Sequence, residues 1–187
     1  MPKASTSPHS GLSELEGGVL GIVSGAPGST AHGVREQFRL SRSSHWSGSA
    51  GAIYPLMKKL HERGLLTAEE SQRGTGVRRS YSISATGSKE LKRWLGPPLP
   101  EWVASVTFDP LRTRMSFLDA LSPAKQESFL VEAERMLTEE LQETREELDH
   151  VRETGSFWEV VTGEGCQAIT QARLRWIRRI LEALRES

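Results

Sequence analysis

The sequence predicts a mainly α-helical fold with one small β-hairpin. Apolar residues recur at helical spacing along most of the 187 residues. This spacing changes to strand-like alternation only once, between Leu65 and Ile83. A Gly-Pro-Pro-Leu-Pro segment, residues 96–100, separates the two halves of the chain. We therefore expect a helical domain that carries the hairpin, followed by an all-helical domain.

The composition excludes several classes of protein. With 36% hydrophobic and 26% charged residues, the sequence is not that of a disordered chain. The single cysteine, Cys166, excludes a disulfide framework and a cysteine-based zinc site within one chain. No apolar run approaches the roughly 20 residues of a membrane-spanning helix, and the N-terminus lacks the apolar stretch of a signal peptide. We therefore expect a cytoplasmic location.

The net charge of zero conceals an uneven distribution. Residues 1–95 carry 13 lysines and arginines against 7 acidic residues, a net charge of +6. Residues 96–187 carry 11 against 17, a net charge of −6. A basic half is typical of a domain that binds a polyanion, although two solvated surfaces would have the same composition.

Capping signals predict the first two helices. After a flexible tail, residues 1–11, Ser13 and Glu16 form the capping box of a first helix. Thr30 can cap a second helix over residues 31–40. The residues expected to face the core are Leu12, Leu15, Val19, Leu20, Val23, Val34 and Phe38.

A third helix is expected after a polar segment. Residues 41–48 predict a loop or tight turn whose aromatic residue, Trp46, fills an edge of the core. Ser49 predicts the cap of a helix that ends near Arg63, where Gly64 stops it. The buried stripe of this helix is expected to be Ile53, Leu56, Met57 and Leu60.

The hairpin and a fourth helix complete the first half. Residues 65–73 and 77–83 predict two antiparallel strands joined by a glycine-rich tip, residues 74–76. Ser84 can cap a fourth helix that ends at Leu95. We therefore expect one domain over residues 12–95.

The second half begins after a linker, residues 96–109. Three helices are expected beyond it, over residues 110–121, 123–151 and 157–184, the second preceded by a Ser-Pro start. The predicted seam of the long middle helix is Leu137, Leu141, Thr144, Leu148 and Val151. The predicted stripe of the last helix is Ile169, Ala172, Trp176, Ile177, Ile180, Leu181 and Leu184.

Two long helices with narrow apolar stripes do not enclose a large core alone. A homodimer made by helix exchange or coiled-coil-like pairing would complete their burial. The alternative is a bundle that packs onto the first half of the same chain. We expect residues 110–187 to form a helical dimerisation and effector domain.

The order of three helices, a hairpin and a further helix predicts a winged helix-turn-helix domain. Specific residues extend this interpretation, because residues 49–66 resemble the recognition segment of the PadR family of transcriptional regulators. A small residue, glycine, a small residue, an aliphatic residue and Tyr-Pro open this segment, which ends in Gly-Leu. The matching residues include Gly51, Ala52, Ile53, Tyr54, Pro55, Gly64 and Leu65.

The resemblance extends along the rest of the first half. Residues 79–87 are similar to the second strand and helix cap of the family, and residues 15–23 and His32-Gly33 to its first two helices. Beyond Pro100 the similarity is only architectural, to the longer C-terminal dimerisation domain of one branch of the family.

The resemblance implies a DNA-binding surface made by the third helix and the wing. The third helix would enter the major groove, and the basic wing would contact phosphates. The predicted DNA-binding residues are Ser47, Ser49, Gly51, Ala52, Tyr54, Lys58, Arg73, Thr75, Arg78 and Arg79. For each of them, capping or ordinary surface exposure is the alternative.

Other chemistry has weaker support in the sequence. The five histidines lack metal-ligand spacing, and no nucleophile motif is present, so we expect no enzymatic activity, metal or cofactor. Cys166 is either redox-sensitive or a small hydrophobic residue. The aromatic residues Trp102, Phe108, Trp158 and Trp176 would line an effector pocket or belong to the core.

Together these observations predict a sequence-specific DNA-binding regulator. Its expected partners are double-stranded DNA and a second copy of itself, and the resemblance implies repression from an inverted-repeat operator, with modulation by a small-molecule effector. The alternative is a protein- or ligand-binding adaptor that keeps the winged-helix scaffold without binding DNA. A membrane partner is not expected.

Overall fold

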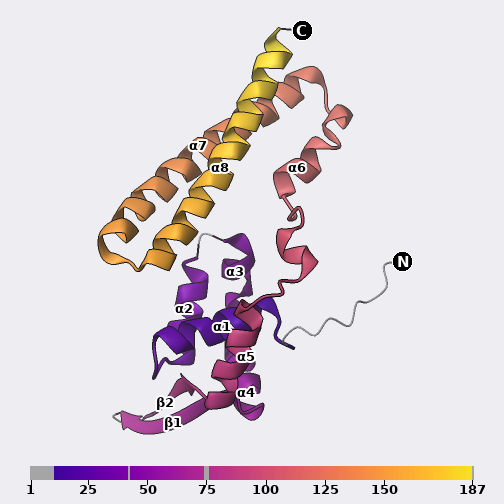
Figure 1. Ribbon diagram of the computed structural model, residues 1–187. Coiled ribbons are helices and arrows are strands. Elements are labelled where there is room, and N and C mark those ends of the chain that lie inside the picture. Colours follow the sequence, from indigo (N-terminus) through magenta and orange to yellow (C-terminus); the bar gives the residue numbers. More distant parts are fainter. Residues whose placement is uncertain (1–10, 42, 74–75, 187) are drawn as a thin grey trace. The chain divides into compact units, whose positions relative to one another are not determined.

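The computed structural model describes residues 11–41, 43–73 and 76–186, which form two compact units (Figure 1). The first unit is Met1–Val106 and the second Thr107–Ser187. The division falls within the segment predicted as a linker, residues 96–109. The mainly helical fold with a small hairpin is confirmed.

The first unit is a winged-helix domain. Its elements follow the chain in the predicted order of helices, hairpin and helix. They are α1 (Glu14–Gly25), α2 (Ala31–Arg39), α3 (Ser44–Ser49), a 3₁₀ turn (Ala50–Ala52), α4 (Ile53–Glu62), β1 (Leu66–Arg73), β2 (Gly76–Ile83), α5 (Ala85–Leu95) and a 3₁₀ turn (Glu101–Ala104). The two strands pair antiparallel, from Leu66 opposite Ile83 to Arg73 opposite Gly76.

Local capping fixes where most of these helices begin. Ser13 and Glu16 form the predicted capping box, and Thr30 and Ser84 accept hydrogen bonds from the backbone N–H groups three residues on. Gly64, with φ of 70°, adopts the left-handed conformation that follows the end of α4. The predicted starts of α1, α2 and α5 are therefore confirmed.

One hydrophobic core joins the helices of the first unit to the base of the wing. Its fully buried side chains come from α1, α2 and α4, and the hairpin adds Leu66 and Tyr81. The completely inaccessible residues include Val19, Leu20, Val23, Val34, Phe38, Ile53, Met57 and Leu60. This core holds α4 and the wing in a fixed relation.

The prediction of a loop over residues 41–48 is wrong. Residues Ser44–Ser49 form α3, and Trp46 stacks on Phe38 with ring centroids 4.6 Å apart. Ser49 does not cap the third helix, because its hydroxyl donates to the backbone oxygen of His45. A short polar segment becomes helical here because Trp46 packs against the core, a contact that local spacing does not reveal.

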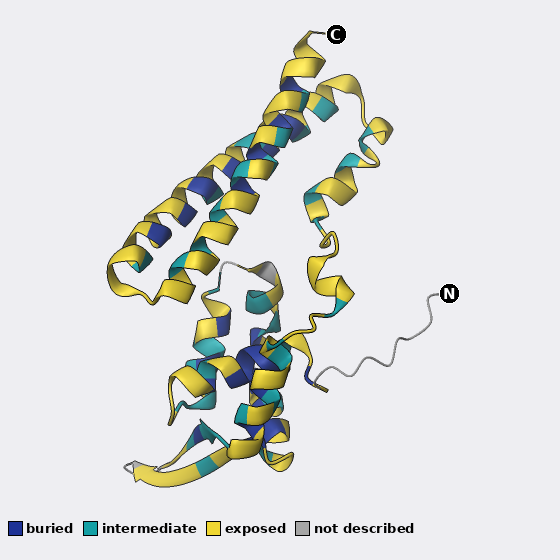
Figure 2. Cartoon of the chain, viewed as in Figure 1, coloured by how far each residue is buried: buried dark blue, intermediate teal, exposed yellow. Residues whose placement is uncertain are grey.

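The second unit is a helical hairpin with one short additional helix. Its elements are α6 (Pro110–Met115), a 3₁₀ turn (Leu118–Ala120), α7 (Pro123–Thr154) and α8 (Phe157–Arg185). The predicted helix over residues 110–121 is thus too long, because α6 ends at Met115. Figure 2 shows the buried residues of α7 and α8 on the sides where the helices face each other.

The seam of α7 is largely as predicted, whereas the predicted stripe of α8 is buried or half-buried only at Trp176, Ile177, Ile180 and Leu181. Leu137, Leu141, Thr144 and Leu148 are buried against α8. On α8 the buried residues are Thr170, Leu174, Ile177 and Leu181. The predicted stripe is therefore corrected: Ile169 is 64% exposed, and Ala172 and Leu184 are exposed as well. Within the described residues, no helix is long and apolar enough to span a membrane.

Candidate nucleic-acid interface

A groove of about 510 Å³ lies where α2, α4 and the wing of the first unit meet. The first turn of α2, the first turn of α4 and the outer half of β2 supply its walls. It is lined by Thr30, Ala31, His32, Tyr54, Val77, Arg78, Arg79 and Tyr81. None of these eight side chains is acidic, and two are arginines, so the groove suits an anionic group such as a phosphate.

Tyr54 is the residue of α4 that lines this groove. It follows buried Ile53 in the first turn, and its side chain is 49% exposed. One face of α4 anchors the helix through Ile53, Met57 and Leu60. Tyr54 is thereby held at the surface with its hydroxyl available to a phosphate or a base edge.

The two lysines of α4 differ in their contacts. Lys58 lies one turn after Tyr54, is exposed, and pairs loosely with Glu62 at 3.8 Å. Lys59 lies 3.5 Å from the carboxylate of Glu16 on α1. Both lysines are exposed, but Lys58 pairs within its own helix, whereas Lys59 links α4 to α1.

The arginines of the wing lie on opposite faces of β2. Arg79 lies over the ring of Tyr81, 5.9 Å from its centroid, and pairs with Glu70 on β1 at 3.4 Å. Arg78 is exposed, and no ion pair of Arg78 occurs among the described residues. Both side chains nevertheless line the groove. Thr75 lies outside the described residues; Arg73 is described only as the last residue of β1.

The small residues predicted before the recognition helix do not line this groove. Ser47 and Ser49 donate their hydroxyl protons to backbone oxygens of Ser43 and His45 within α3. Gly51 and Ala52 are exposed in the 3₁₀ turn that precedes α4. These four residues therefore flank α4, and of the predicted residues whose side chains the structure describes, Tyr54, Arg78 and Arg79 line the groove.

A backbone contact that the sequence did not indicate fixes the α2 wall of the groove. Ser29 and Tyr81 form an isolated antiparallel bridge, in which the N–H of Tyr81 donates to the oxygen of Ser29 at 2.8 Å. The N–H of Gly28 donates in return to the oxygen of Tyr81 at 3.0 Å. This single bridge holds the segment before α2 against β2, and Thr30 and His32 line the groove beside the wing. The positive φ of Gly28, 81°, permits this path, and its Pro-Gly sequence was the available signal.

Glu16 is a buried carboxylate that connects α1 to the end of α4. Its Oε1 accepts a hydrogen bond from Arg63 at 2.6 Å, and its Oε2 accepts one from the N–H of Ser13 at 2.9 Å. Burial raises the pKa of Glu16, but the Ser13 N–H and the charges of Arg63 and Lys59 lower it by more. The net pKa lies below the ordinary value, so this carboxylate stays charged and holds α4 in place.

The predicted effector residues are divided between the two units. Trp102 lies in the first unit, whereas Phe108, Trp158 and Trp176 belong to the second. Trp158 and Trp176 are 18 residues apart on α8, which is roughly 27 Å along a helix. The alternative prediction, that these residues belong to the core, is wrong for Trp102, Phe108 and Trp158, which are exposed. Of the four, Trp176 is the one that is half-buried against the α7–α8 core.

Two further expectations concern single residue types. Cys166 is a free, exposed cysteine on α8. Among the residues that the structure describes, no group of three histidines, cysteines or carboxylates could hold a metal ion.

Comparison with known proteins finds a family match within the first unit. Residues 19–93 match the model of the transcriptional regulator PadR-like family, which confirms the resemblance predicted from the sequence. A curated relative, the negative transcriptional regulator PadR of Bacillus subtilis strain 168, is 28% identical over 96 residues. This match spans about half of the chain and about half of the length of the relative.

Solved structures share the fold of both units. Bacillus subtilis PadR in complex with operator DNA has a TM-score of 0.79 and 19% identity, covering 92% of this chain and 98% of that one. The PadR-like regulator BC1756 of Bacillus cereus has a TM-score of 0.75 and 18% identity, with 92% and 99% covered. A further structure is B. subtilis PadR with p-coumaric acid, at a TM-score of 0.72 and 19% identity, with 91% and 98% covered. At sequence identities of 18–19%, this structural similarity shows that the chain shares their fold.

Proposed function

We propose that the chain is a sequence-specific DNA-binding regulator that acts as a homodimer, since residues 19–93 match the model of the transcriptional regulator PadR-like family. The observation that supports this function best is the groove beside Tyr54. It combines a partly exposed tyrosine at the start of α4 with two arginines of the wing and no acidic residue in its lining. In the proposed complex α4 enters a major groove, and the wing follows the adjacent phosphates.

The role of repressor is part of the proposal. It is supported by the relative in B. subtilis, which is a negative regulator. A winged helix that covers promoter DNA would hinder the polymerase without any further contact. Regulation by a small molecule is also proposed, since B. subtilis PadR has been solved with p-coumaric acid.

The direct test is selection of binding sites from genomic DNA. Purified protein is incubated with sheared DNA from its own source, and the retained fragments are sequenced. We expect enrichment of an inverted repeat. Retention without any enriched sequence would contradict the proposal and favour the adaptor function.

A substitution in α4 then tests the groove on the selected operator. Tyr54→Ala should weaken specific binding by roughly 1–3 kcal/mol, the value of a good base contact, and Tyr54→Phe isolates the hydroxyl. Lys125→Ala, an exposed cation in the first turn of α7, is the control and should bind like the wild type. Unchanged operator affinity of Tyr54→Ala would remove this residue from the interface.

A further inference from the structure

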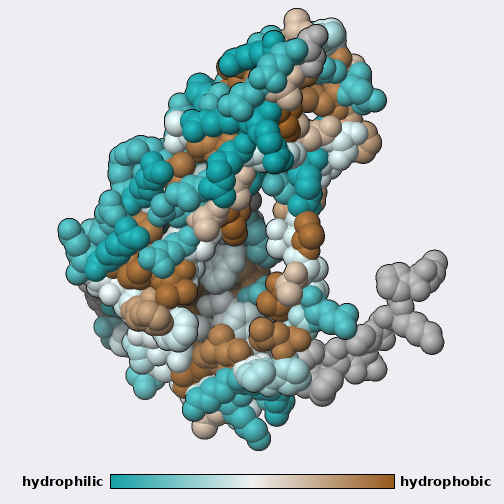
Figure 3. All heavy atoms as spheres, turned by 45° about the horizontal axis from the view of Figure 1, so that its top comes forward, coloured by the Kyte–Doolittle hydropathy of each residue, from teal (hydrophilic) through white to brown (hydrophobic). Residues whose placement is uncertain are grey.

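The two arginines that line the groove differ in their ionic partners. Arg79 lies 3.4 Å from the carboxylate of Glu70 on β1, whereas no ion pair of Arg78 occurs among the described residues. Glu70 does not line the groove itself, but through Arg79 it brings a negative charge to its edge. Hydrophilic side chains cover much of the surface in Figure 3, so exposure alone does not single out this carboxylate. Its position in the hairpin is the informative feature.

The register of the hairpin places Glu70 on a face that lines the groove. Successive side chains of a strand point to opposite faces, so Arg79 and Tyr81 of β2 share one face. Residues directly opposite each other in an antiparallel pair lie on the same face, and Glu70 is opposite Arg79. The neighbouring Glu69 is opposite Ser80 and lies on the other face. Of these two adjacent carboxylates, Glu70 is therefore the one that faces the same way as Arg79.

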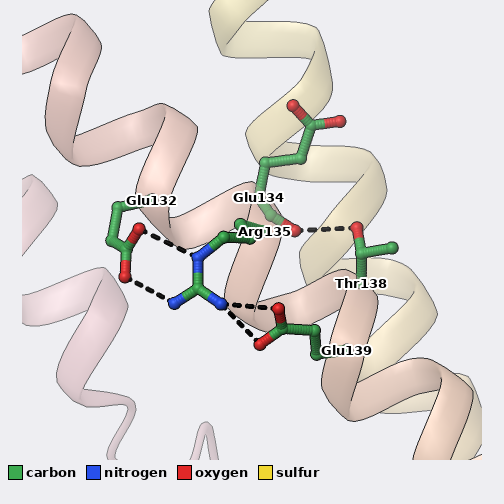
Figure 4. A network of polar contacts seen from close by, with 5 residues as sticks. All are labelled: Glu132, Glu134, Arg135, Thr138 and Glu139. Carbon is green, nitrogen blue, oxygen red and sulfur yellow. Dashed lines mark hydrogen bonds and ion pairs between the residues drawn. The ribbon is translucent and has the colours of Figure 1, made fainter.

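The ion pair between Glu70 and Arg79 is loose enough to be exchanged. Its separation of 3.4 Å exceeds the roughly 2.7–2.9 Å of a charge-assisted hydrogen bond. Both side chains are accessible to solvent, Arg79 at 44% and Glu70 at 60%. Arg135 on α7 shows the contrast, because it binds Glu132 at 2.7 Å and also pairs with Glu139 (Figure 4). A phosphate oxygen that bonds closely to Arg79 would therefore replace a weaker contact.

Tyr81 supports the guanidinium of Arg79 independently of its anionic partner. The guanidinium lies over the ring of Tyr81, 5.9 Å from the centroid. Tyr81 belongs to the core, and its backbone N–H donates to Ser29, so the ring is held in place. A contact with the face of a ring leaves the N–H groups of a guanidinium free to donate. Arg79 can therefore exchange one anion for another without leaving the groove.

We propose that Glu70 competes with a DNA phosphate for Arg79 and thereby limits the affinity of the wing for DNA. In the free protein the carboxylate of Glu70 is the anionic partner of Arg79. In the complex a phosphate oxygen takes its place, and Glu70 turns into solvent. Arg78, which forms no ion pair with a described residue, has no such competitor. This inference rests on the DNA binding of the proposed function and adds a residue that acts against it.

Glu70→Gln tests the competition by equilibrium binding to the selected operator. The substitution preserves the size of the side chain and removes its charge. At about 50 mM salt, where phosphate contacts are strong, affinity should rise. The rise should be roughly threefold or more, because each wing of the dimer gains a free arginine. Glu69→Gln removes the same charge from the other face of the strand and is the matched control, which should gain less. No gain in Glu70→Gln, or an equal gain in Glu69→Gln, would overturn the inference.

A double-mutant cycle separates competition for Arg79 from a general effect of charge. In an Arg79→Ala background, Glu70→Gln should raise affinity by a smaller factor, because no arginine remains to be released. An equal factor in both backgrounds would show that Glu70 repels DNA without holding Arg79, contrary to the proposal. Circular dichroism of each variant checks that it is folded, as expected for substitutions of two accessible side chains.

DNA without the inverted repeat separates this inference from the proposed function. Contacts with phosphate carry no sequence information, so Glu70→Gln should raise affinity for such a fragment by a similar factor. A gain confined to the operator would contradict competition for a phosphate. If the wild type binds both fragments equally, the sequence-specific regulator fails while the effect of Glu70 can still be measured; if it binds neither, both proposals fail.

Discussion

At the scale of single residues, the first unit depends on polar groups whose roles differ from those of their neighbours. Lys58 and Lys59 are adjacent in sequence, yet only Lys59 reaches the carboxylate of Glu16. Glu16 in turn combines a helix cap with a contact to Arg63, 47 residues away. A residue that appears to be a local capping signal therefore also sets the position of α4.

Substitution of Glu16 tests this double role. Glu16→Gln keeps the capping oxygen and removes the charge, so we expect a loss of about 1–2 kcal/mol of unfolding free energy at pH 7. The pKa of Glu16 is lower in the folded protein than in the unfolded chain. The stabilisation by its charge is therefore complete above the unfolded-state pKa, and it is lost as the pH falls through the folded-state pKa.

Chemical denaturation at pH 7 and at pH values below 4 measures the difference. The difference in unfolding free energy between the wild type and Glu16→Gln should become smaller at acidic pH. A gap that is independent of pH would show that the charge of Glu16 does not stabilise the fold.

At the scale of elements, the wing and α5 are placed by close backbone contacts. The N–H of Ser84 and its hydroxyl bind the oxygens of Leu65 and Gly64, so the start of α5 lies against the start of β1. Gly87, in the first turn of α5, packs against the backbone of Leu65, and a Cβ at this position would lie 2.0 Å from the oxygen of Leu65. This approach fixes the base of the hairpin, and hence the direction of its tip.

Glycine substitutions separate this packing from helix propensity. Gly87→Ala should lower the free energy of unfolding by roughly 2 kcal/mol or more, because backbone atoms must move. Gly21→Ala in α1, where a Cβ has no neighbour within 4 Å, should raise it by up to about 1 kcal/mol. Thermal denaturation of both variants measures the contrast, and a stable Gly87→Ala protein would contradict the close approach.

The wing arginines give a second prediction for an element. If Arg78 and Arg79 each neutralise one phosphate, their replacement by alanine should reduce the salt dependence of operator binding by about two units of slope for each half-site. Operator affinity measured across a series of salt concentrations provides the slope. Arg135→Ala, whose guanidinium pairs with two glutamates of α7, is the control. An unaltered slope in the wing variant would mean that the wing does not contact DNA.

At the scale of the whole molecule, two-fold symmetry would relate the protein to its operator. A dimer that presents two copies of α4 predicts an inverted repeat, with half-site centres about 10 base pairs or a multiple apart. The second unit carries a net charge of −6 together with the residues of the linker. Because DNA repels this half, the basic winged helix is the part expected to contact DNA.

Changes in the spacing of the repeat test this symmetry. Insertion of about 5 base pairs between the half-sites, half a helical turn, should reduce binding to that of a single half-site. Insertion of about 10 base pairs restores the relative orientation and serves as the control. Gel-shift affinities for the three operators distinguish the outcomes, and equal binding to all of them would exclude a fixed two-fold arrangement.

Three of the eight residues that line the groove follow from the sequence. Tyr54, Arg78 and Arg79 line the groove, and each was predicted from the resemblance and the basic wing. The contribution of Thr30 and His32 was not predicted, because it depends on the bridge between Ser29 and Tyr81, which are 52 residues apart. No periodicity within one segment reveals such a contact.

The sequence by itself determined the helix starts at Ser13, Thr30 and Ser84, the hairpin, and the division into a basic and an acidic half. These features depend on residues a few positions apart, where capping and side-chain alternation act directly. Only the tertiary structure decided that Trp46 makes α3 helical by packing on Phe38, and that Thr170, Leu174, Ile177 and Leu181 are the residues of α8 that are buried. Both depend on which distant surfaces meet, and burial against another element outweighs the local preference of a short segment.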